Sequence, residues 1–86
     1  MVTAHEGEAG CSEIEQWANR IAKQSDEDTA VQVFYDADSN TYILRLAKAA
    51  RVLVFRLSVA QVRGSGREIE CERTLQRKSK DLRHLI

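Results

Sequence analysis

The sequence has few cysteines and no long apolar run. Cys11 and Cys71 stand sixty positions apart and outside any CxxC pair, which favours reduced thiols over a disulfide framework or a zinc site. The longest uninterrupted apolar stretch, Val52–Phe55, is far shorter than the roughly 20 residues that cross a bilayer. No apolar run follows the charged first ten residues, as a secretory signal would require. We therefore expect a cytoplasmic protein that does not engage a membrane.

Recognisable catalytic motifs are also missing. No GxSxG, P-loop, HExxH or GxGxxG pattern occurs, and the two histidines, His5 and His84, stand near opposite ends of the chain. Asp36 and Asp38 supply too few oxygen ligands for a calcium loop and are better explained as turn formers. The sequence therefore predicts a protein that is not an enzyme, and it indicates no cofactor, no metal and no small-molecule ligand.

Length and composition are those of one small domain. The chain has 86 residues, of which 43% are apolar and 30% charged, close to ordinary globular usage. A chain of this length hides only about 60–70% of its unfolded surface, so its core must be small. Residues 1–10 show no hydrophobic periodicity and predict a mobile lead-in, while residues 11–86 predict a single α+β domain.

The charges are unevenly distributed although the net charge is zero. Residues 1–44 hold two basic side chains against nine acidic ones, a net charge of −7, and residues 45–86 hold eleven against four, a net charge of +7. Such an asymmetry raises the question of a polyanionic partner. The alternative is neutralisation between the two halves, within one chain or within a dimer.

A helix is predicted to begin at Ser12. Ser12 and Glu15 have the spacing of a capping box, in which each side chain bonds a free backbone N–H of the first turn. One apolar stripe follows at the i, i+3, i+4 and i+7 spacing of a helix: Ile14, Trp17, Ala18 and Ile21. On such a stripe we interpret Trp17 as a core residue rather than a binding platform.

The middle of the chain alternates between apolar and polar residues over 30–36, 41–47 and 51–57, which predicts a three-stranded antiparallel meander. The connection 48–50 contains no glycine, asparagine or aspartate, although tight hairpin turns require them. Residues 42–57 also fit a helical stripe, which leaves a helix as the alternative. We favour the meander because a lone strand at 30–36 would leave its backbone groups without partners.

The last third predicts a second amphipathic helix. Capping-box patterns begin at Ser58 and Ser65, which indicates a short helix or turn at 59–62, a break at Gly64–Gly66 and a main helix over 67–85. Its apolar stripe comprises Cys71, Leu75, Leu82, Leu85 and Ile86. The expected fold is therefore α+β in the order α-β-β-β-α, a three-stranded antiparallel meander with two helices packed on one face.

This order of elements resembles that of double-stranded RNA-binding domains, and Gly64–Arg67 is similar to their glycine-and-basic helix start. The resemblance implies contact with RNA through the start of the last helix. Where the family has lysines, however, this sequence has Glu68, Glu70 and Glu72, which would repel phosphate. The family's Gly-Pro loop is also replaced by Asp36-Ala37-Asp38.

A row of basic residues marks the last predicted helix. The i, i+4, i+7, i+11 spacing of Arg73, Arg77, Lys80 and His84 places them on one exposed side, opposite the apolar stripe. Such a row can follow phosphates without reading bases, and it is also typical of an ordinary solvated face. The candidate polyanion-binding residues are Arg73, Arg77, Lys80, His84, Arg63 and Arg67.

The third predicted strand is unusually apolar for an edge strand, which indicates self-association by strand pairing. Ile69 falls on the outward side of the last helix and offers a second contact. The candidate self-association residues are Val52, Val54, Arg56 and Ile69. The favoured hypothesis is a small non-catalytic protein-interaction or structural module, bound to itself or to another protein; the alternative is a weak nucleic-acid-binding module that uses the basic helix face.

Overall fold

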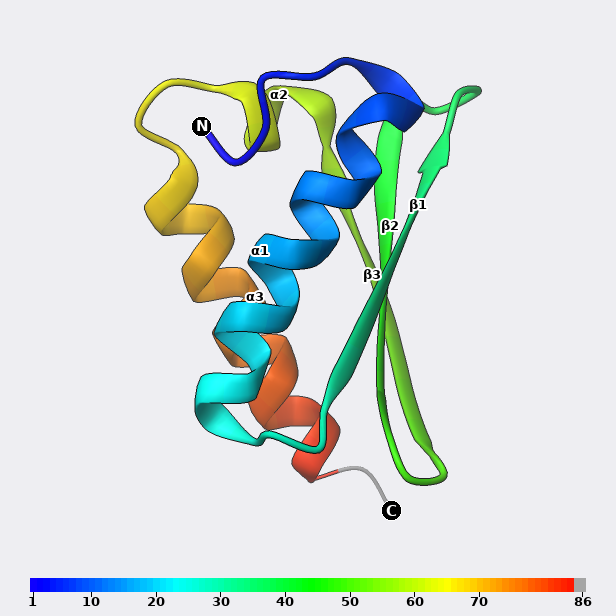
Figure 1. Ribbon diagram of the computed structural model, residues 1–86, viewed down its shortest axis with the longest axis vertical. Helices are drawn as coiled ribbons and strands as arrows, with labels where there is room; N and C mark the ends of the chain where they lie inside the picture. Colours follow the sequence, from blue (N-terminus) through cyan, green and yellow to red (C-terminus); the bar gives the residue numbers. More distant parts are fainter. Residues whose placement is uncertain (85–86) are drawn as a thin grey trace.

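The computed structural model describes residues 1–84, and its elements follow the predicted order (Figure 1). A short 3-10 helix, η1 (Gly7–Gly10), leads into α1 (Cys11–Ser25). The strands β1 (Ala30–Asp36), β2 (Thr41–Lys48) and β3 (Arg51–Ser58) come next, and α2 (Val59–Arg63) and α3 (Glu68–Arg83) complete the described chain.

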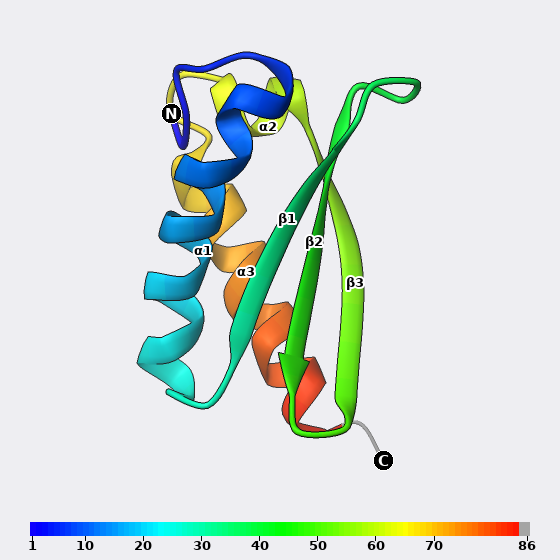
Figure 2. The same cartoon turned by 45° about the vertical axis from the view of Figure 1, so that its right-hand side comes forward.

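The strands form one antiparallel sheet in the order β1-β2-β3. Figures 1 and 2 show α1 and α3 side by side on one face of this sheet, and no helix of residues 1–84 covers the opposite face. The predicted α+β meander with two helices on one face is confirmed. The molecule thus has two layers, and only one side of the sheet belongs to the core.

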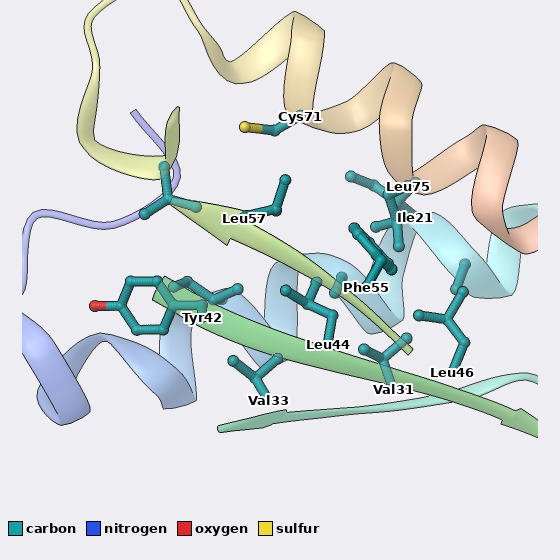
Figure 3. Close-up of a cluster of buried hydrophobic side chains, with 14 of the residues drawn as sticks. Ile21, Val31, Val33, Tyr42, Leu44, Leu46, Phe55, Leu57, Cys71 and Leu75 are labelled. Carbon is teal, nitrogen blue, oxygen red and sulfur yellow. The ribbon is translucent and has the colours of Figure 1, made fainter. Parts of the chain in front are cut away.

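The core lies between these layers. Alternate residues of each strand point toward the helices, and Figure 3 shows Leu44 and Phe55 of the sheet meeting Ile21 of α1 and Leu75 of α3. Trp17 is half-buried against this cluster. The helical stripes follow the predicted spacing, with Ile14, Ala18, Ile21 and Ala22 buried from α1 and Cys71, Leu75, Ser79 and Leu82 from α3. Leu85 and Ile86, expected on the same α3 stripe, lie outside the described residues.

The helix starts agree only partly with the capping patterns. Ser58 and Gln61 form the predicted capping box at α2, each side chain bonding the other residue's backbone N–H. The prediction at Ser12 was wrong, because α1 begins at Cys11 and has no side-chain cap. The prediction at Ser65 was also wrong, because α3 begins after Arg67 without a side-chain cap.

Residues 1–10 contribute to the packed structure. The Val2 N–H donates to the Val62 carbonyl at 2.7 Å, and the Tyr42 hydroxyl donates to the Gly7 carbonyl at 2.6 Å. Thr3 is buried and its hydroxyl donates to Glu13. The expected boundary at residue 11 therefore does not mark the edge of the fold.

The helical alternative for residues 42–57 does not form; two strands and a tight turn occupy that segment. Lys48 pairs with Arg51, so only Ala49 and Ala50 make the turn. Ala49 has a φ of +54°, in the left-handed region that alanine adopts at a cost of about 1–2 kcal/mol. Because the turn contains no glycine, Ala49 adopts the left-handed conformation, and the backbone is strained there.

Replacing this alanine with glycine should stabilise the protein. We expect Ala49→Gly to raise the free energy of unfolding by about 0.5–1 kcal/mol, because glycine occupies the left-handed region without a steric penalty. Denaturant unfolding followed by circular dichroism would measure the change. Ala50→Gly is the matched control, since Ala50 has no positive φ, and it should lower stability. Equal effects at both positions would contradict strain at Ala49.

Candidate self-association surface

The sheet face turned away from the helices is rich in apolar side chains. Phe34 of β1 is 50% exposed, and Val52 and Val54 of β3 are 42% and 56% exposed. Ile43 lies opposite Phe34 of β1 and opposite Arg56 of β3 in the register, and it is half-buried. We call Phe34, Ile43, Val52 and Val54 the open-face cluster. Adjacent large apolar groups on an uncovered face are typical of a contact surface.

Two arginines share this face, and each is held by a neighbouring side chain. Arg45 donates from Nη1 to Gln32 Oε1 at 3.1 Å. Arg56 donates from Nη1 to Asp36 Oδ2 at 3.1 Å and to Thr41 Oγ1 at 2.9 Å. Arg56 of β3 therefore reaches across the sheet to the last residue of β1 and the first residue of β2.

Asp36 compensates the charge of Arg56. Its carboxylate accepts hydrogen bonds from the Ser39 hydroxyl and the Arg56 guanidinium, which hold the pKa of Asp36 below its ordinary value. Asp36 Oδ1 also accepts from the Asp38 N–H at 3.1 Å, as expected of a turn former. The Arg56 guanidinium thus has a counterion, the Asp36 carboxylate, within its own chain.

Side chains of α1 close the outer edge of β1. Asn19 Oδ1 accepts from the Val31 N–H at 2.9 Å, and Asn19 Nδ2 donates to the Val31 carbonyl at 2.9 Å. Two residues along the strand, Glu15 Oε1 accepts from the Val33 N–H at 3.1 Å. The helix therefore occupies three of the outward backbone groups of β1, which another strand would need.

The opposite edge, on β3, is open. In an antiparallel sheet the residues that bond a neighbouring strand alternate with those whose backbone groups point away from it. The backbone N–H and carbonyl groups of Val31 and Val33 point away from β2. The register then assigns the outward backbone groups of β3 to Val52, Val54 and Arg56. No helix, loop or side chain within residues 1–84 bonds these groups. The open edge and the open-face cluster therefore meet along one strand.

The structure unites three of the four candidate self-association residues. Val52, Val54 and Arg56 share both the open edge and the uncovered face, whereas Ile69, 60% exposed, lies on α3 in the helical layer (Figure 2). Phe34 and Ile43 were not among the candidates. The alternation within 30–36 and 41–47 contained their signal, but it did not show which face the helices would cover.

The candidate polyanion-binding residues lie on α2, on α3 and at the start of α3. Arg73, Arg77, Lys80 and His84 are exposed on α3, and no ion pair between residues 1 and 84 uses them. Arg63 instead donates to Glu6 Oε1 at 3.0 Å and lines a recess of about 440 Å³. Arg67 is exposed and directly precedes α3. The basic row is thus confined to the outer side of one helix.

Comparisons with models of protein families, with curated proteins and with solved structures found no match for this chain. The likeness to double-stranded RNA-binding domains stays one of element order. Across residues 1–84, no three histidine, cysteine, aspartate or glutamate side chains are grouped so that they could hold a metal. No helix of that part of the chain has the length and apolarity to cross a membrane.

Removing the side chain that closes β1 should destabilise the fold. Asn19→Ala leaves the Val31 N–H and carbonyl without their partner, and we expect a loss of about 1–2 kcal/mol in the free energy of unfolding, even though alanine favours helices. Chemical denaturation would measure it. Gln16→Ala, on the same helix at an exposed position, should change stability by less than about 0.5 kcal/mol. Equal losses would show that Asn19 does not seal the edge.

Proposed function

We propose that this chain is a non-catalytic protein-interaction module that associates with a second copy of itself through β3. The support is the difference between the two sheet edges. Asn19 and Glu15 bond outward groups of β1, while the outward backbone groups of Val52 and Val54 on β3 have no partner within residues 1–84. An exposed apolar edge strand is a template for pairing with another strand.

A second copy is compatible with this surface in charge. The chain has no net charge, so two copies approach without overall repulsion. The Arg56 of each copy is compensated by Asp36 of the same copy. Two such edges can therefore meet without bringing together uncompensated charges from their β3 strands. Small domains with limited cores commonly gain stability by such association.

The molar mass in solution tests this proposal. Sedimentation equilibrium or light scattering at micromolar concentrations should show a dimer. Val54→Lys should raise the dimer dissociation constant at least about tenfold, because it replaces an apolar contact between the two edges with two like charges. A strictly monomeric parent chain up to high micromolar concentration would refute the proposal.

Ile69→Lys is the matched control for this substitution. Ile69 and Val54 are similarly exposed, at 60% and 56%, and both variants gain the same charge. The dimer should survive the change at Ile69, because that side chain lies on α3. Dissociation by Ile69→Lys but not by Val54→Lys would place the contact on the helical layer instead.

The basic row of α3 supports a second candidate function, weak binding of nucleic acid. Arg73, Arg77 and Lys80 are exposed without ion pairs among the described residues, and such cations attract phosphates without base specificity. Glu70 and Asp81 on the same helix reduce this field. The second candidate therefore predicts low affinity that falls steeply as salt rises.

Titration with short duplex RNA, duplex DNA and single strands at low salt tests the second candidate. Amide shifts should cluster on residues 73–84, and the double variant Arg73→Glu, Arg77→Glu should weaken binding at least about tenfold, since each phosphate contact adds to affinity. Gln76→Glu on the same helix is the control, because it adds one negative charge without removing a basic residue, and it should weaken binding less. Absence of shifts on 73–84 with all ligands would exclude this function.

A further inference from the structure

We infer that two copies pair their β3 strands antiparallel about a two-fold axis through Val54, so that two three-stranded sheets become one continuous sheet. This inference rests on the proposed self-association and specifies its register. On β3, Val52, Val54 and Arg56 present outward backbone groups that have no partner within residues 1–84, whereas the outward Ser58 N–H donates to Gln61 Oε1. In an antiparallel pair, hydrogen-bonded residues must lie opposite one another.

The axis at Val54 uses every available edge group. Val54 lies opposite Val54 of the second copy, and Val52 lies opposite the second copy's Arg56 on each side of the axis. Each of these three residue pairs exchanges both backbone hydrogen bonds. The two-fold axis runs perpendicular to the sheet, so Val52 and Val54 of both copies stand on the same uncovered face.

A shift of the axis toward α2 loses hydrogen-bonded pairs or opposes like charges. With the axis at Phe55, Val52 would lie opposite Ser58, whose N–H already donates to Gln61 Oε1 at 2.8 Å in the α2 capping box. With the axis at Arg56, two guanidinium groups would lie directly opposite each other, which is unfavourable. The capping box therefore limits strand pairing at one end of β3.

A shift toward the β2–β3 turn loses contacts. With the axis at Leu53, Arg56 would lie opposite Ala50, which belongs to the turn that follows Lys48. The backbone groups of Arg56 would then have no strand residue opposite them to bond. The two ends of β3 together leave the register centred on Val54 as the one that pairs all three edge residues.

The register also separates the cations. Arg56 of one copy lies opposite Val52 of the other, and its guanidinium stays with Asp36 and Thr41 of its own chain. Arg51 points to the helical side, where Nη1 donates to the Arg83 carbonyl at 2.8 Å. Arg51 and Arg56 therefore lie on opposite faces of the joined sheet.

Cysteine cross-linking in the full chain tests the register. In the proposed pairing the two Val54 Cα atoms are about 5.5 Å apart, within the range for a disulfide. The two Val52 residues are offset by four positions, about 13 Å along the strands. Under mild oxidation, Val54→Cys should form a covalent dimer at least about ten times faster than Val52→Cys, with the unsubstituted chain giving the background from Cys11 and Cys71.

A double variant provides an independent reading. Val52→Cys combined with Arg56→Cys should cross-link, because these positions lie opposite each other across the axis, while neither substitution alone should do so. Circular dichroism would verify that each variant is folded. The pattern of Val54→Cys and the double variant cross-linking, with the other single variants unreactive, supports the register.

Two other results separate this inference from the proposed function. A parent chain that is a dimer by mass, but in which Val54→Cys stays unlinked or Val52→Cys alone links rapidly, would overturn the register and leave self-association standing. A parent chain that is monomeric at every concentration would overturn both.

Discussion

The hydrogen bonds between α1 and the outer edge of β1 are the contact on which the rest of the architecture depends. Asn19 bonds both backbone groups of Val31, and Glu15 bonds the next outward N–H at Val33. These bonds fix the helix at one side of the sheet and satisfy groups that would otherwise be exposed. A small sheet has two edges, and this contact closes only one of them.

The β3 edge and the sheet face turned away from the helices are both left uncovered by residues 1–84, for one geometric reason. The two long helices pack side by side on one face, where the inward residues of all three strands form the core (Figures 2 and 3). The other face then contains only the alternate residues, among them the open-face cluster. Because β3 lies at the end of the strand order, its outward backbone groups and its outward side chains form one continuous surface.

Ion pairs lie at both ends of the sheet. Arg56 is compensated by Asp36 at the β1–β2 end, and Lys48 pairs with Asp26 beside the other end of the sheet. The exposed cations of α3 lie in the helical layer instead. The acidic first half and the basic second half of the sequence thus meet in local ion pairs, which supports internal neutralisation as one role of the charge asymmetry.

Much of the fold follows from periodicity that the sequence shows directly. Alternation over 30–36, 41–47 and 51–57 determined three strands, and the i, i+3, i+4, i+7 stripes determined the two long helices, because burial of one face requires those spacings. Local signals were less reliable at the helix starts. The Ser58 box formed, whereas Glu15 of the Ser12 pattern bonds β1 instead of its own helix.

Only the tertiary structure decided which strand edge stays open. The sequence contains Asn19 and Glu15 as ordinary polar residues of a helix, and their bonds to β1 depend on how the helix lies across the sheet. Phe34 and Ile43 could not be assigned to the surface for the same reason, since either face of a strand can be the buried one until the helices pack. Sequence periodicity sets which side chains share a face; packing of distant segments determines which face and which edge meet solvent.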